Sequence, residues 1–172
     1  MQGRKNLPGH GNDRLPVQIL RPDFTFRSKG MPRLHVQHIS LQPDAPFFLP
    51  DTPGVTIHER VAPGARESIV QKHFPNSFRE TNLLDLLRDR DAERIVVCGM
   101  MTHMCIDATA RAAADLGFKV IIVSDACATR ALKHDDVDIP AEHVQGAFLA
   151  ALKIYGQVLT TEEALSTLAS FS

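Results

Sequence analysis

The chain has 172 residues, 44% of them hydrophobic, and a formal net charge of −1, which suits a single domain with a buried core. Its Lys and Arg residues are scattered, so the composition gives no reason to expect nucleic acid or an anionic membrane as a partner. No apolar run approaches the ~18 residues of a membrane span, and the N-terminus has no apolar signal-peptide core.

The first 30 residues differ in composition from the rest of the chain. Residues 1–30 are rich in glycine, proline and charged side chains, and only Val17–Leu20 resembles a strand. This composition is typical of irregular structure. The sequence therefore predicts an irregular, atypical N-terminal segment at residues 1–30 and one folded domain at residues 31–172.

Regular structure is expected to begin with a strand at residues 33–40. This strand contains two histidines, His35 and His38, which invite a metal assignment. Residues three apart in a strand point to opposite faces, however, so the two imidazoles cannot readily share one ion. We interpret both as ordinary polar or core histidines.

A long, proline-rich connection follows at residues 41–67 and includes Phe47 and Phe48. A connection of this length is typical either of a lid that shapes a substrate site or of a packed loop that covers a sheet edge. The next strand is expected at residues 68–74, with Lys72 near its end.

Pro75 stops this strand, and Asn76 or Ser77 can cap a helix whose apolar stripe includes Phe78. A lysine at a strand end is usually a solvated charge. Lys72 becomes notable only if the neighbouring strand leads to a cysteine, because a nearby ammonium favours a thiolate.

Residues 94–125 form the centre of the predicted fold, a βαβ unit. The apolar runs Ile95–Val97 and Val120–Val123 predict strands buried on both faces, as in a parallel sheet covered by helices. Residues 105–116 lie between them and are rich in alanine, which predicts a helix. Gly117 is placed to end that helix with a positive φ.

This unit places Cys105 at the amino end of a helix, just outside the carboxyl end of a central strand, where open α/β sheets bind ligands. The positive end of the helix dipole and the free backbone N–H groups favour a thiolate and an oxyanion there. One interpretation is a cysteine nucleophile. The other is a small apolar residue that fills the core, as free cysteines often do.

The other two cysteines are Cys98, within a strand, and Cys127, just after one, and we expect both to be packing residues. Asp125 is a candidate catalytic acid, although carboxylates at strand ends more often cap loops. Three cysteines without metal-ligand spacing favour a reduced, cytoplasmic setting with no metal and no cofactor.

The C-terminal region predicts a helix at residues 141–152, a strand at residues 157–159 and a final helix that begins at Thr160 or Thr161. Thr160 and Glu163 have the spacing of a capping box. Strands that alternate with helices in this way indicate an α/β fold with a parallel sheet.

Three motifs resemble the isochorismatase-like cysteine hydrolase family: Lys72–Thr81, Val97–Cys105 with its G-x-x-T-x-x-C pattern, and Val123–Thr129. They occur in the family's order, and the resemblance covers about residues 30–165. It implies a Rossmann-like, three-layer α/β/α fold with a mostly parallel sheet. It also implies hydrolysis of a small amide, carbamoyl or vinyl-ether substrate.

The same resemblance implies roles for individual residues. Cys105 is expected to be the nucleophile and Lys72 to assist it, and the Met100–Met101 peptide is expected to be cis. The oxyanion region is expected to comprise Met100, Met101, Thr102 and Cys105, and the substrate pocket His38, Phe78 and His103. Family members are often oligomeric, so a homo-oligomer that takes a small-molecule substrate is expected.

One departure from the family pattern concerns its opening strand, which ends in D-x-Q and supplies a general-base aspartate. The nearest match here is Asp23, but only residues 24–32 separate it from the strand at Arg33. A parallel crossover needs about a dozen residues or more. We therefore expect the first strand to be missing or replaced, with a replaced or misread N-terminal region and an activity impaired by the absent aspartate.

Two alternatives stay open, and a third is disfavoured. A catalytically inactive family member would bind a small molecule or a protein. A redox-sensing protein would pair Cys105 with Cys98 or Cys127, although no C-x-x-C spacing supports it. A metal-dependent, nicotinamidase-like relative is disfavoured, because residues 37–40 lack a D-x-H ligand pair.

Overall fold

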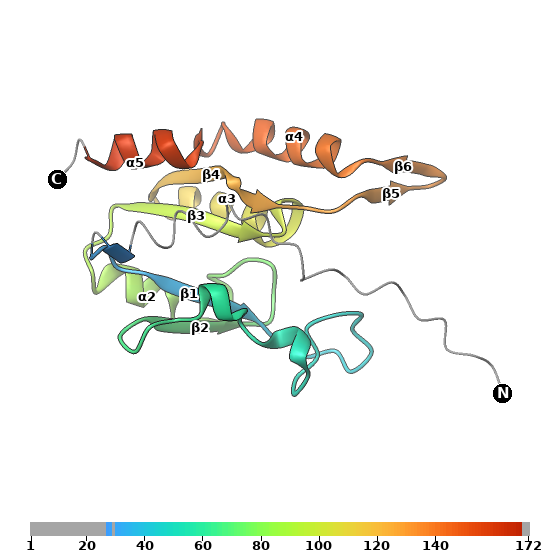
Figure 1. Cartoon of the computed structure of the whole chain (residues 1–172), viewed down its shortest axis with the longest axis horizontal. Helices are drawn as coiled ribbons and strands as arrows, with labels where there is room; N and C mark the ends of the chain where they lie inside the picture. Colours follow the sequence, from blue (N-terminus) through green and yellow to red (C-terminus); the bar gives the residue numbers. More distant parts are fainter. Residues whose placement is uncertain (1–26, 29, 170–172) are drawn as a thin grey trace.

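The computed structural model describes residues 27–28 and 30–169 (Figure 1). The strands are β1 (Leu34–His38), β2 (Ser68–Lys72), β3 (Arg94–Met100), β4 (Lys119–Ala128), β5 (Leu132–His134), β6 (Val137–Ile139) and β7 (Gly156–Leu159). The helices are α2 (Leu83–Arg88), α3 (Asp107–Asp115), α4 (Ala141–Leu152) and α5 (Thr161–Ala169), with short 3-10 turns η3 (Pro53–Val55) and η4 (Glu59–Val61) and a π-helical turn η5 (Thr102–Ile106). Val17–Leu20 and Asp23 lie outside the described residues, so the expectations for them stay predictions.

The larger parallel sheet has the strand order β3–β4–β7 and carries most of the core. Successive apolar side chains of β4 point to opposite faces. Val120 and Ile122 pack with residues of α3 and α4, whereas Ile121 and Val123 pack with Ala164 of α5. Helices therefore cover both faces of the sheet, which confirms the predicted three-layer α/β/α arrangement.

β1 and β2 form a separate two-stranded parallel sheet that packs against α2. In the part of the chain that the structure describes, no ladder joins β1 to β3 and β1 is the first strand. The expected loss of an opening strand concerns residues before Arg27 and stays a prediction. The prediction that Ile95–Val97 are buried on both faces is wrong, since these residues are half-buried. Cys98, expected to be a packing residue, is exposed, because among the described strands only β4 pairs with β3.

Aromatic and aliphatic side chains hold the two sheets together. Phe78, in the connection after β2, stacks on Phe118, just before β4, with ring centroids 6.2 Å apart. Both rings and Ile95 of β3 contact the core of the larger sheet and also the core formed by β1, β2 and α2. Side-chain packing therefore joins the two sheets.

Local sequence signals place the C-terminal elements correctly. α4 has the predicted bounds, and the predicted capping box forms, with the Thr160 N–H donating to Glu163 Oε2 at 2.7 Å and the Glu163 N–H to Thr160 Oγ1 at 3.3 Å. Gly117 follows α3 with a φ of 91°, as expected for a helix end. None of the described helices is long and apolar enough to cross a bilayer.

Two elements differ from the sequence-based expectation. The helix expected directly after Pro75 begins only at Leu83. Asn76 Oδ1 instead accepts the Phe78 N–H at 2.9 Å in a turn, and Glu80 has a positive φ of 55°, which a helix does not allow. The antiparallel β5–β6 hairpin, which extends beyond β4 in Figure 1, is not among the predicted elements.

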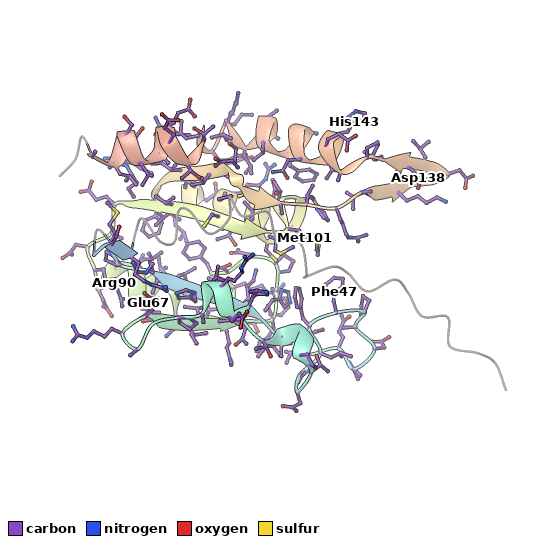
Figure 2. All side chains as sticks on the ribbon, viewed as in Figure 1. Phe47, Glu67, Arg90, Met101, Asp138 and His143 are labelled. Atoms are coloured by element: carbon purple, nitrogen blue, oxygen red, sulfur yellow. The ribbon has the colours of Figure 1, made fainter. Side chains whose placement is uncertain are left out.

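Glu67 ties the start of the described chain to the beginning of β2, beside the smaller sheet (Figure 2). Its carboxylate accepts hydrogen bonds from Arg27 (2.8 and 3.0 Å), from Arg33 and from the Gly64 N–H (2.9 Å), and it contacts His35 Nε2 at 2.7 Å. The hydrogen bonds from Arg27, and then from Gly64, hold the pKa of Glu67 well below its ordinary value.

We predict that Glu67→Gln lowers the melting temperature at neutral pH and speeds tryptic cleavage at Arg27 and Arg33. A carboxyl with a lowered native pKa stabilises the fold above its unfolded-state pKa and loses that contribution as pH falls. The difference in melting temperature between wild type and variant is therefore expected to shrink below about pH 4.5. Glu162→Gln, at an exposed position of α5, is the matched control, and equal melting at pH 7 for all three proteins would contradict the prediction.

Candidate active site

Lys72 is the last residue of β2, and its side chain is buried, with 3% of the residue exposed. The parallel register places it opposite His38, the last residue of β1. Its Nζ donates to the Pro75 carbonyl at 2.6 Å. The turn that follows β2 therefore fixes the ammonium at the carboxyl edge of the smaller sheet.

Thr109 of α3 connects this turn to the larger sheet. Its Oγ1 accepts the Ser77 N–H at 3.1 Å, lies 2.8 Å from Ser77 Oγ and lies 3.4 Å from the Pro75 carbonyl. Thr109 is four residues after Cys105, so the two side chains lie on the same side of one helical unit. The position of the Lys72 ammonium is thereby linked to the helix that carries the cysteine.

Cys105 lies in η5, the π-helical turn that leads directly into α3. The helix therefore begins three residues before the expected start at Cys105. The Met100–Met101 peptide before it is cis, as the resemblance implies, and Figure 2 shows Met101 at the end of β3. Thr102 is fully buried and donates from Oγ1 to the Ala128 carbonyl at 3.2 Å, which fixes the turn against β4.

Among the described residues, His38 contacts the thiol. Cys105 Sγ lies 3.9 Å from His38 Nδ1. The imidazole also stacks on Phe48, with centroids 5.1 Å apart and an interplanar angle of 19°. Burial, followed by the positive charge of Lys72, lowers the pKa of His38, so the ring is neutral at neutral pH.

The other two predicted pocket residues occupy different surroundings. His103 contacts Thr129 Oγ1 through Nδ1 and meets Phe148 edge-on at 6.0 Å. Burial, followed by the charge of Arg130, lowers its pKa. Phe78 lies in the joint between the two sheets, on Phe118, and a role for either residue in a substrate pocket stays a prediction.

Asp125 and Cys127 also lie near the end of β4, where Asp125 caps a helix and Cys127 is buried. Asp125 Oδ1 accepts the N–H and the hydroxyl of Thr161, each at 2.8 Å, and so caps the start of α5. Burial raises the pKa of the Cys127 thiol to about 12. Within residues 27–28 and 30–169, no group of three His, Cys, Asp or Glu side chains is arranged to hold a metal ion.

A cavity of about 380 Å³ lies away from this site, at the amino ends of β1 and β2. Its lining includes Arg27, Arg33 and Glu67, and Arg33 and Glu67 immediately precede the two strands. The carboxyl ends of the same strands carry His38 and Lys72. The cavity and the thiol therefore lie at opposite edges of the smaller sheet.

The chain was compared with known proteins. The family model described as "Isochorismatase domain" matches residues 23–163. The isochorismatase family protein YddQ of Bacillus subtilis is 51% identical over 80% of this chain and 77% of that protein. Streptothricin hydrolase of Streptomyces noursei is 42% identical over 67% of this chain and 42% of that protein.

A solved structure gives the same picture. A crystal structure from Oleispira antarctica, assigned to the isochorismatase hydrolases, superposes with a TM-score of 0.80 at 42% identity. The match covers 86% of this chain and 78% of that one. The part of the chain that includes both sheets thus has the architecture of an experimentally determined protein.

We predict that Thr109→Val destabilises the protein by about 1–3 kcal/mol, because the buried Ser77 N–H loses its acceptor. The valine keeps the shape of threonine, so the loss reflects the hydrogen bonds. Urea unfolding measures it, and Thr167→Val on α5 is the matched control. A Thr109→Val protein as stable as the control would show that the link between the turn and α3 carries no energy.

We predict that iodoacetamide modifies Cys105 near pH 8 and leaves Cys127 unmodified in the native protein. A thiol with a pKa of about 12 has only ~10⁻⁴ of its population as thiolate at that pH. Peptide mapping by mass spectrometry distinguishes the sites, and the exposed Cys98 serves as the internal reference. Modification of Cys127 at the rate of Cys98 would contradict the prediction.

Proposed function

The chain belongs to the isochorismatase family, and from that premise we propose that it is a cysteine hydrolase that cleaves the C–N bond of a small amide or carbamoyl substrate. Cys105 is the nucleophile in this proposal, and Lys72 assists it. The observation that carries the proposal is the position of Cys105 in the first helical turn after β3, with its thiol 3.9 Å from an imidazole nitrogen.

The names of several relatives support hydrolysis at a C–N bond. Streptothricin hydrolase is one of them, and maleamate amidohydrolase of Pseudomonas putida, 33% identical over 64% of this chain and 47% of that protein, is another. A solved structure from Pseudomonas syringae, called a cysteine hydrolase, matches with 27% identity and a TM-score of 0.80. These proteins support the reaction class and leave the substrate of this chain to experiment.

The proposed reaction has two stages. The Cys105 sulfur loses its proton and attacks the substrate carbonyl, and the tetrahedral oxyanion lies near backbone N–H groups at the start of the helix, in the region of Met101 and Thr102. Collapse of this intermediate expels the amine and leaves a thioester on Cys105. Water then hydrolyses the thioester, which releases the acid and restores the thiol.

The buried ammonium of Lys72 suits this reaction electrostatically. Lys72 is buried opposite His38, at the carboxyl ends of β1 and β2, and the Cys105 thiol lies at the same end of these strands. A positive charge in low-dielectric surroundings favours the thiolate and the oxyanion over their neutral forms. The Pro75 carbonyl, which also accepts from the Thr109 hydroxyl, holds the ammonium in place without neutralising it.

We also propose that the chain acts as a homo-oligomer in the cytoplasm. Val36 of β1 and Met100 of β3 are exposed on strands that face the break between the sheets, and exposed strand edges favour association. All three cysteines are free thiols, which suits a reducing compartment.

We predict that the purified protein releases ammonia or an amine from members of a panel of small amides and carbamoyl compounds. Cys105→Ala is expected to reduce this release on the order of 10³-fold or more, because the covalent intermediate cannot form. Cys98→Ala, at an exposed position of β3, is the matched control and should retain the wild-type rate. Retained hydrolysis by Cys105→Ala would refute the proposal. An equal loss of hydrolysis in Cys105→Ala and Cys98→Ala would indicate non-specific thiol chemistry.

A further inference from the structure

We infer that His38 takes the proton from Cys105, so that a cysteine–histidine pair activates the nucleophile in this chain. The inference rests on the proposed function, because it supplies the base for the same thiol. It differs from the base implied by the family resemblance, which is an aspartate on an opening strand. Among the described residues, the imidazole of His38 lies within hydrogen-bonding distance of Cys105 Sγ.

The two side chains come from different sheets and meet at the break between them. His38 ends β1 of the smaller sheet, and Cys105 follows β3 of the larger one. Their separation of 3.9 Å from Nδ1 to Sγ is a contact in which a thiol can donate its proton to an imidazole nitrogen. Catalytic hydrogen bonds in ligand-free proteins are often long and shorten when substrate binds.

The imidazole is held in the orientation that directs Nδ1 at the thiol. Phe48, in the connection between β1 and β2, stacks on the ring at 5.1 Å. The Ser40 N–H donates to the Phe48 carbonyl at 2.7 Å, which fixes that part of the connection beside the end of β1. The connection between β1 and β2 therefore contacts the reacting pair through Phe48.

The charges around the ring favour its neutral, proton-accepting form. Lys72 and His73 face it from the end of β2, and Cys105 faces it from η5. Burial, then Lys72, and also His73 lower the pKa of His38, while a hydrogen bond with the His73 backbone raises it. A neutral imidazole whose Nδ1 lone pair is free can accept a proton at neutral pH.

The proton transfers balance over the two stages. The thiol proton moves to His38 Nδ1 as sulfur bonds to the carbonyl carbon. When the C–N bond breaks, the imidazolium returns that proton to the departing nitrogen, and the amine leaves neutral. In the second stage His38 takes a proton from water as its oxygen attacks the thioester, and then returns it to the Cys105 sulfur.

The test compares His38→Gln with His143→Gln, both in a Cys98→Ser background that leaves Cys105 as the reactive thiol. His143 lies on an exposed face of α4 (Figure 2), so it controls for loss of an imidazole. The first readout is the rate of Cys105 alkylation by iodoacetamide from about pH 6 to pH 9, which needs no substrate. We expect His38→Gln to react about tenfold or more slowly near pH 7, and the difference between the two rates to shrink at higher pH, where hydroxide replaces the imidazole as the base.

The second readout is rescue by free imidazole. His38→Ala leaves space beside the thiol, and added imidazole is expected to restore its alkylation rate while leaving His143→Gln unchanged. A purely structural role for His38 would not give this rescue. If His38→Gln destabilises the fold, as judged by circular dichroism, the rescue of His38→Ala still decides the question.

The outcomes separate this inference from the proposed function. Wild-type alkylation rates in His38→Gln near pH 7, together with no imidazole rescue of His38→Ala, would overturn the role of His38. If hydrolysis is lost in Cys105→Ala but kept in His38→Gln, the base assignment alone fails. If hydrolysis persists in Cys105→Ala, the proposed function fails, and the alkylation data still report whether His38 activates the thiol.

Discussion

The site depends on how two separate parallel sheets are held together. His38 and Lys72 end strands of the smaller sheet, whereas Cys105 follows a strand of the larger one. The stack of Phe78 on Phe118 and the hydrogen bonds from Thr109 to the turn after β2 join them. Side-chain packing is sensitive to small changes in volume, so contacts outside the site help to set the thiol–imidazole distance.

Sequence reasoning succeeds for elements whose signals are local. The continuous apolar run Val120–Val123 identifies a strand buried on both faces, and the Thr160–Glu163 spacing identifies the start of α5. Sequence reasoning fails where contacts that the local pattern does not reveal determine the structure. The apolar run of β3 reads as fully buried, yet its exposure depends on whether a strand pairs with its second edge, and the late start of α2 depends on a turn formed by Asn76.

The candidate site shows the same division. Cys105 and Lys72 are identifiable because each lies at the carboxyl end of a predicted parallel strand, where ligand sites occur. The family resemblance places His38 in the substrate pocket but does not predict its contact with the thiol, because pairing His35 with His38 considers only one strand. The register of β1 against β2 supplies the missing information, since it places His38 opposite Lys72 and at the edge that faces η5.

The buried ammonium of Lys72 limits how the thiol and imidazole can share a proton. An imidazolium beside it would place two positive charges in a partly desolvated region, and this lowers the pKa of His38. Lys72 therefore weakens His38 as a base and disfavours a resting thiolate–imidazolium pair. Proton transfer is expected to accompany attack on the carbonyl, when the same ammonium stabilises the negative charge that develops on the substrate oxygen. The same repulsion makes the transient imidazolium a stronger acid, which aids the return of the proton to the leaving nitrogen. One buried lysine thus favours both charge development at the carbonyl and release of the amine.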